Sequence, residues 1–164
     1  MSKSHVYQGR IFDLGHLSDL SYDMHVVLKN GTEKDVTVTW RFSCHCYSRT
    51  PRESEMFAEE RIVWDHKRLR LFSIRRYEFS VRLPEIVRAL PSKTVYKTQY
   101  HNMVHVTLAE GEDYAVFFTL RRNGDGVLAF IESAYPVDEV KRIEKSGKPM
   151  RFATAVAKAF ERTL

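Results

Sequence analysis

Residues 114–136, YAVFFTLRRNGDGVLAFIESAYP, decide the expected fold of this chain. Two runs rich in Val, Phe, Leu and Ile flank the tetrapeptide at 123–126, Asn-Gly-Asp-Gly. Asn, Asp and Gly adopt the backbone conformations of tight turns at low cost, so the pattern predicts a β-hairpin. Polar residues occur at positions where a buried hairpin would not require them. Their polar groups either form hydrogen bonds within the structure or belong to a functional site. These residues are Thr119, Arg121, Arg122, Glu132, Ser133 and Tyr135.

The length and composition predict one globular unit. The chain has 164 residues, of which 43% are hydrophobic and 12% aromatic. Such a chain can bury one substantial core, and we find no linker, so a single domain over residues 1–164 is expected. No apolar run has the roughly 18 to 20 residues of a membrane-spanning helix, and the N-terminus lacks the apolar centre of a signal peptide. We therefore expect a cytoplasmic protein without a membrane partner; the sequence carries no signal for the oligomeric state.

The charge is basic. Lys and Arg number 26 against 21 Asp and Glu, which gives a formal net charge of +5. Arginines cluster within residues 61–82 and at 121–122. This balance favours an anionic partner such as nucleic acid, although a solvated basic face without a partner would have the same composition.

The N-terminal half predicts a second hairpin. Asn30-Gly31 is a turn signal between residues 22–29 and a strand that begins near Lys34. Apolar residues alternate along that strand as far as Cys46, which places His45 on the opposite, wetter face together with Arg41 and Tyr47.

Helical periodicity appears in two places. Apolar residues between Phe79 and Leu90 predict a central helix with Ser80 as its N-cap and Pro84 in its first turn. An apolar stripe from Phe152 to Phe160 predicts a C-terminal helix.

This order of elements predicts an α+β fold, in which an antiparallel β-sheet of hairpins packs with one central and one C-terminal helix. Residues 1–74 would form an N-terminal β-hairpin region. Residues 75–164 would form a helix, a four-strand antiparallel meander and the closing helix.

Cys44 and Cys46 flank His45 and are the only cysteines. A structural zinc site needs four ligands, and no second cysteine pair exists, so we expect both cysteines to be small buried hydrophobic residues. A metal site that includes this segment and a distant histidine is the alternative. Neither a metal nor another cofactor is expected.

The C-terminal half resembles a family of nucleases. From Tyr77 onward, a helix precedes antiparallel strands that end in the tetrapeptide 133–136, Ser-Ala-Tyr-Pro, and a closing helix follows Lys148-Pro149. This pattern resembles the small RNase-toxin superfamily that groups barnase, EndoU, colicin-type and RelE-type nucleases, including phage-borne members. The resemblance implies metal-independent cleavage of RNA, and a toxin-like role implies a protein partner such as an antitoxin.

Such cleavage needs groups that transfer protons to and from the reacting oxygens and cations that stabilise the phosphate charge. Histidine and arginine provide these functions near neutral pH. The expected catalytic residues are His45, His105, Thr119, Arg121, Ser133 and Tyr135, and the expected phosphate-binding residues are Arg41, Arg76 and Arg122.

Each candidate has a structural alternative. Thr119 and Ser133 would pair across the hairpin, and Tyr135 would be a core tyrosine. Arg121 and Arg122 would be solvated charges near the turn, and each histidine would be a surface residue or a hydrogen-bonded core residue. A small basic ribonuclease is therefore the leading hypothesis. The alternative is a module that binds nucleic acid or a protein without catalysis.

Overall fold

The hairpin at 114–136 organises the largest sheet of the computed structural model, which describes residues 3–98, 101–108, 111–137 and 147–162. Strand β10 (Asp113–Asn123) pairs antiparallel with β11 (Gly126–Pro136), and Gly124 in the turn has a φ of +58°, which suits glycine. The predicted hairpin is therefore confirmed.

The other strands of the C-terminal half follow the predicted meander. Strand β8 (Thr94–Lys97) pairs with β9 (Asn102–Thr107), and β9 pairs with β10, in each case antiparallel. Strand β12 (Lys148–Arg151) then adds to the free edge of β8. The pairing of β9 with β10 ends at Phe118, so the second half of β10 has no strand beside it on that side among the described residues.

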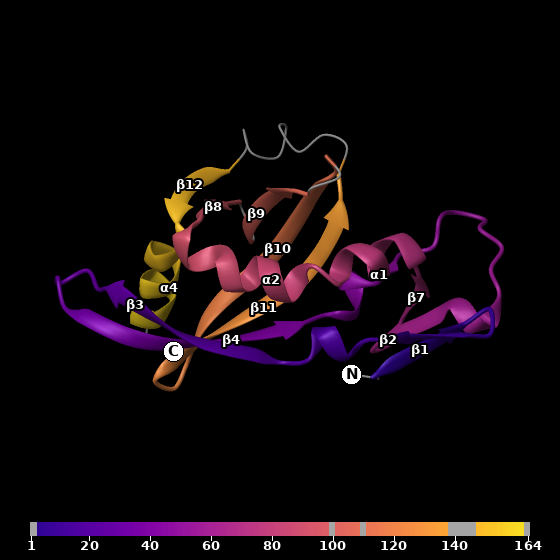
Figure 1. Cartoon of the computed structure of the whole chain (residues 1–164), viewed down its shortest axis with the longest axis horizontal. Helices are drawn as coiled ribbons and strands as arrows, with labels where there is room; N and C mark the ends of the chain where they lie inside the picture. Colours follow the sequence, from indigo (N-terminus) through magenta and orange to yellow (C-terminus); the bar gives the residue numbers. More distant parts are fainter. Residues whose placement is uncertain (1–2, 99–100, 109–110, 138–146, 163–164) are drawn as a thin grey trace.

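A parallel pairing joins the two halves of the chain. Strands β3 (Leu20–Val27) and β4 (Glu33–Phe42) form the predicted N-terminal hairpin, and β4 lies parallel to β11. The resulting sheet has seven strands in the order β12-β8-β9-β10-β11-β4-β3 (Figure 1). A sheet built only from antiparallel hairpins was therefore too simple an expectation.

The predicted central helix is two helices. Helix α1 (Ile74–Ser80) is capped by Ser73, whose hydroxyl accepts a hydrogen bond from the Arg76 amide, and α2 (Leu83–Ala89) carries Pro84 in its first turn. The prediction of Ser80 as an N-cap was wrong, because Ser80 ends α1 and its buried hydroxyl donates to the Tyr77 carbonyl. The C-terminal helix α4 (Phe152–Glu161) is confirmed.

The remaining elements are short and lie mainly in the N-terminal half, beside the large sheet in Figure 1. Strands β1 (Ser4–Tyr7) and β2 (Arg10–Asp13) pair with each other, and β5 (Ser48–Arg49), β7 (Arg68–Phe72) and β6 (Ile62–Asp65) form a three-stranded sheet. The 3-10 turns are η1 (Gly15–Leu17), η2 (Cys44–Cys46), η3 (Glu59–Arg61) and η4 (Leu90–Ser92).

The core lies between the large sheet and its helices. Trp40 of β4 is fully buried, and its ring lies 5.3 Å from that of Phe118 and 5.9 Å from that of Phe152 on α4. Tyr114 on β10 contacts Phe79 of α1 on the same face. Because side chains alternate along a strand, the intervening residues of β4, β10 and β11 point to the opposite face.

Candidate functional site

A row of residues crosses three strands on the sheet face opposite Trp40. Thr119 of β10 lies opposite Phe130 of β11, and Phe130 lies beside Arg41 of β4. Arg121 follows two residues after Thr119 and therefore points to the same face. These strands form what we call the arginine hollow, a cavity of about 300 Å³ lined by Arg41, Thr119, Arg121, Leu128, Phe130 and Glu132.

A second cavity lies where β9 stops pairing with β10. This basic hollow has a volume of about 270 Å³ between the β8–β9 hairpin, β10 and α4. It is lined by Lys97, Thr98, His101, Asn102, Thr119, Leu120, Met150, Ala155, Lys158, Ala159 and Arg162. Thr119 lines both hollows, so the two cavities are neighbours.

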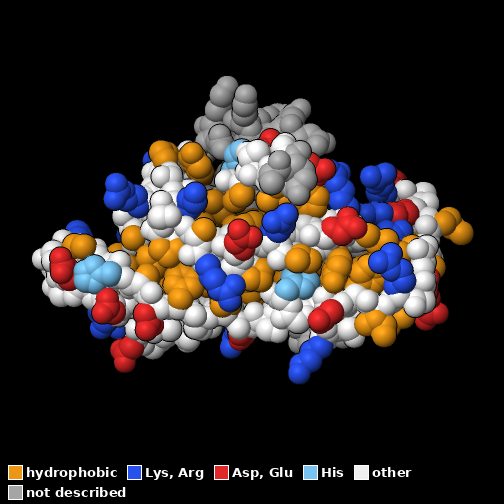
Figure 2. All heavy atoms as spheres, viewed as in Figure 1, with side chains coloured by type: hydrophobic (Ala, Val, Ile, Leu, Met, Phe, Trp, Pro, Cys, Tyr) orange, Lys and Arg blue, Asp and Glu red, His pale blue; other side chains and the backbone are white. Residues whose placement is uncertain are grey.

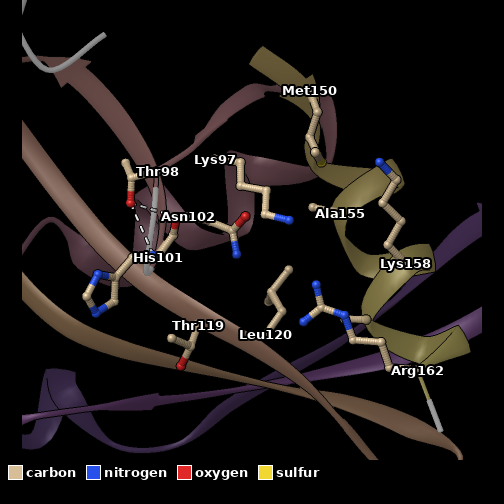
Figure 3. A pocket seen from close by; sticks show the side chains of 11 residues that line it. Lys97, Thr98, His101, Asn102, Thr119, Leu120, Met150, Ala155, Lys158 and Arg162 are labelled. Atoms are coloured by element: carbon tan, nitrogen blue, oxygen red, sulfur yellow. Dashed lines mark hydrogen bonds between the residues drawn. The ribbon is translucent and has the colours of Figure 1, made fainter. Parts of the chain in front are cut away.

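Positive charge converges in the basic hollow. Figure 3 shows that the Lys97 ammonium, the Asn102 amide and the Arg162 guanidinium point toward the same space, whereas the Lys158 ammonium extends along α4. Among the residues that the structure describes, no acidic residue lines the cavity, and neither Lys97 nor Arg162 forms an ion pair. Unpaired cations around a phosphate-sized space favour an anionic ligand.

The face that carries α1 and α2 has a different character. Figure 2 shows Lys and Arg side chains there interspersed with Asp, Glu and hydrophobic groups. The basic hollow differs from that surface because none of the described residues that line it is acidic.

Sequence reasoning did not identify this hollow. Lys97, Lys158 and Arg162 were not among the predicted site residues. The spacing of four residues between Lys158 and Arg162, which places them one helical turn apart, was the available signal. Lys97 carried no local signal, because only the fold brings β8 close to α4.

His45 does not lie on a strand beside Arg41. The extended strand ends at Phe42, because the Ser43 hydroxyl donates to the Glu132 carbonyl and accepts from the His45 amide, which starts η2. The His45 Nε2 atom lies 2.8 Å from an Asp65 carboxylate oxygen. The structure therefore places His45 with Asp65, and His45 lines neither of the two hollows.

His105 also has a carboxylate partner. Its Nε2 atom lies 2.8 Å from Asp113 Oδ1, and its side chain is 16% exposed. His105 lies opposite Ala115, which in turn lies opposite Tyr135, so these residues share one sheet face with Thr119. His105 lines neither the arginine hollow nor the basic hollow.

Thr119 and Ser133 do not pair with each other. Ser133 lies opposite Phe117, and a bulge separates that pair from the pairing of Phe118. The Thr119 hydroxyl donates instead to the Glu132 carboxylate, at 3.3 Å. The structural alternative of a Thr119–Ser133 pair across the hairpin was wrong, because the turn at 123–126 sets a register that places Thr119 opposite Phe130, three residues from Ser133.

Tyr135 and Arg76 pack together at the end of β11. The Arg76 guanidinium lies 5.2 Å from the centre of the Tyr135 ring and donates to the carbonyls of His45 and Ser48. Burial lowers the pKa of Arg76. These contacts give Arg76 a structural role in holding η2 against α1.

Arg122 also makes contacts within the fold. Its Nε atom donates to the Gly124 carbonyl at 3.2 Å, and its guanidinium lies 4.8 Å from the centre of the Phe160 ring. Arg122 thus packs the hairpin turn against α4. Of the predicted site residues, Thr119, Arg121 and Arg41 come together in the arginine hollow.

These observations define an α+β protein with a basic hollow at an incompletely paired sheet strand. The chain belongs to the YjaZ family, whose model matches residues 4–160. No curated protein and no solved structure matches the chain, and nothing in these comparisons links it to the nuclease superfamily that its sequence resembles. No helix in the described part of the chain is long and apolar enough to cross a membrane.

Proposed function

We propose that this protein binds single-stranded RNA, with phosphate groups in the basic hollow and the adjoining arginine hollow. The observation that carries the proposal is the convergence of Lys97 and Arg162 on a cavity whose described lining residues include no acid. Lysine and arginine bind phosphate by charge and by hydrogen bonding, and the Asn102 amide adds a neutral donor.

The arginine hollow extends this surface. Arg41 and Arg121 are exposed, and the partly exposed ring of Phe130 lies between their strands. An aromatic ring beside cations is typical of single-strand binding, in which bases stack while the backbone contacts positive charge. Arg41 forms an ion pair with Asp19 at 3.1 Å, but both side chains are more than half exposed, so this pair is weak and exchangeable with phosphate.

The test is the salt dependence of RNA binding. Binding of a labelled single-stranded RNA should weaken linearly in a plot of log affinity against log salt concentration. The double variant Lys97→Ala/Arg162→Ala should bind about tenfold more weakly or worse, and its slope should fall by about 1.4, or 0.7 for each lost phosphate contact.

The matched control is the double variant Lys67→Ala/Arg88→Ala, which removes the same charge from exposed positions outside both hollows. It should retain nearly all of the affinity. Equal losses in the two double variants would show that only net charge matters, and would contradict a site at the basic hollow.

Cleavage of the bound RNA is a second candidate function. It is favoured by His105, which has a carboxylate partner and lies on the same sheet face as Thr119. Incubation of total RNA with the protein in EDTA tests it: cleavage should occur and should be lost in His105→Ala. If the RNA stays whole at high protein concentration while binding persists, cleavage is contradicted and the protein is a binding module without catalysis.

An antitoxin or other protein partner stays a prediction.

A further inference from the structure

A cluster of metal-ligating side chains lies outside both hollows. The cluster consists of Cys44, His45 and Asp65, and their potential ligand atoms all lie within 4.8 Å of one another. In a tetrahedral zinc site, bond lengths of about 2.0–2.3 Å place neighbouring ligand atoms roughly 3.3–3.8 Å apart. Small side-chain movements would therefore bring these three groups to coordination distance.

The backbone around the cluster is held in place by several hydrogen bonds. The Ser48 hydroxyl donates to the Cys44 carbonyl at 2.6 Å, and the Arg76 guanidinium donates to the His45 carbonyl at 3.2 Å. Asp65 ends strand β6 immediately before His66, which adopts a φ of +54° in the tight turn to β7. The ligands thus come from two ordered segments that are distant in the sequence.

The donor set suits a borderline-soft divalent cation. A thiolate, an imidazole and a carboxylate are the three ligand types that zinc takes in proteins. Each of the three residues is partly exposed, so an ion could enter and a water molecule could complete the coordination. Three protein ligands with an open fourth position are characteristic of catalytic zinc sites, whereas structural sites are closed by a fourth protein ligand.

Cys46 is less suited than Cys44 to bind a metal in this cluster. Its side chain is fully buried, and burial raises the pKa of its thiol to about 12. Cys44 is only half-buried, although burial and the nearby Asp65 carboxylate also raise the pKa of its thiol. A divalent ion would stabilise the Cys44 thiolate, and binding would release a proton.

Arg70 is the cation next to the cluster, but its hydrogen bonds go elsewhere. Its Nε and Nη2 atoms each lie 2.9 Å from Ser48, from the hydroxyl and the carbonyl oxygen respectively. Before a metal binds, the Cys44 thiol keeps its proton, so the charges of Asp65 and Arg70 balance. Loss of the thiol proton on binding supplies the second negative charge, and the site with Arg70 then carries minus one toward the cation.

We propose that Cys44, His45 and Asp65 form a three-ligand site for zinc or a similar divalent transition metal. This assigns His45 to metal binding instead of proton transfer. It also modifies the sequence-based alternative, in which Cys44, His45 and Cys46 bind a metal together with a distant histidine: Asp65 takes the place of Cys46 and of that histidine. The proposal is independent of RNA binding, because none of the three ligands lines either hollow.

The test measures zinc and cobalt binding by the purified full chain. One equivalent of zinc should remain after removal of free metal, and the cobalt form should show a thiolate-to-cobalt charge-transfer band. Cys44→Ser should abolish that band, and the isosteric Asp65→Asn should weaken zinc binding at least about tenfold. Circular dichroism of each variant establishes that the protein is folded.

The matched control is His25→Ala, because His25 also lies 3.0 Å from a carboxylate oxygen, that of Asp35, at an exposed site. It should leave zinc binding unchanged. A folded wild-type protein that retains no zinc would overturn the proposal. A charge-transfer band that survives in Cys44→Ser and disappears in Cys46→Ala would overturn the ligand set.

Thiol modification provides an independent measurement. Cys44 is the more accessible cysteine, so an alkylating reagent should modify it first. One equivalent of zinc should slow this modification, and Asp65→Asn should remove most of the protection. An alkylation rate that zinc does not change would contradict coordination by Cys44.

Discussion

Gly126 at the start of β11 lies directly against the backbone of Thr37 on β4: a Cβ atom added to this glycine would stand 2.6 Å from the Thr37 carbonyl oxygen. This contact occurs where the parallel pairing of β4 and β11 begins. The hairpin turn at 123–126 therefore satisfies a tertiary requirement as well as a local one.

Gly126→Ala should destabilise the protein. The added methyl group must displace one strand from the other, and such overpacking costs about 1–3 kcal/mol. Urea denaturation should show a lower midpoint with an unchanged slope. The control is Gly124→Asn in the same turn, where φ is +58° and the space is open; asparagine tolerates this conformation, so the cost should stay below about 1 kcal/mol. Equal midpoints for the two variants would contradict the close approach.

Tyr22→Phe should weaken the core around Trp40. The Tyr22 hydroxyl donates to the Val87 carbonyl at 2.9 Å and accepts from the Trp40 indole nitrogen at 3.2 Å. Burial raises the pKa of Tyr22 to about 12, so the hydroxyl keeps its proton at neutral pH. The substitution leaves the buried indole N–H without a partner, at a cost of about 1–2 kcal/mol.

Thermal and urea unfolding measure this cost. The comparison is Tyr77→Phe, whose hydroxyl makes no hydrogen bond to any residue within the described ranges. The Tyr77 variant should unfold close to wild type. If both variants lose the same stability, the Tyr22 hydrogen bonds contribute nothing specific.

Glu132→Gln should strengthen RNA binding. Glu132 is the one acidic residue among the described residues that line the arginine hollow, and its carboxylate accepts a hydrogen bond from Thr119. Glutamine retains an acceptor oxygen and removes the charge. The gain should be about 0.5–1 kcal/mol, or two- to fivefold in affinity, as for one solvated charge. The control Glu78→Gln, on exposed α1 surface, should bind like wild type. An affinity equal to that of wild type would place the RNA outside the arginine hollow, and a weaker complex would contradict repulsion by this carboxylate.

Glu55→Gln should make the free energy of unfolding less dependent on pH in acid. The Glu55 carboxylate accepts hydrogen bonds from Arg49 at 2.8 Å and from the Arg52 amide at 2.9 Å, and these contacts lower its pKa to about 2 from an ordinary value of 4.5. A group whose pKa is lower in the folded state stabilises the fold above its unfolded pKa, and this contribution disappears as the pH falls through the folded pKa.

The wild-type free energy of unfolding should therefore decrease between about pH 4.5 and pH 2 more steeply than that of Glu55→Gln. Urea denaturation at several pH values gives the two slopes. Glu53→Gln, which changes an exposed carboxylate of the same loop, should keep the wild-type slope. Parallel curves for wild type and Glu55→Gln would rule out this ion pair as a source of acid sensitivity.

Local signals determined much of the fold. Asn, Asp and Gly at 123–126 and the flanking apolar runs are sufficient for the β10–β11 hairpin, because a tight turn fixes the pairing of its own neighbours. The last helix followed in the same way from its apolar stripe. The central helix was recognised but not its division, because α1 depends on the cap at Ser73, which precedes the apolar pattern.

Only the tertiary structure decided which residues lie beside the polar residues of the β10–β11 hairpin. The parallel pairing of β4 with β11 has no turn that could reveal it in the sequence, and it brings Arg41 to Thr119 and Arg121. The turn after Phe42 removes His45 from that row and places it beside Asp65. The basic hollow likewise requires β8 and α4 to meet. Contacts between distant segments depend on how the whole core packs, whereas turns and periodicities depend on neighbouring residues alone.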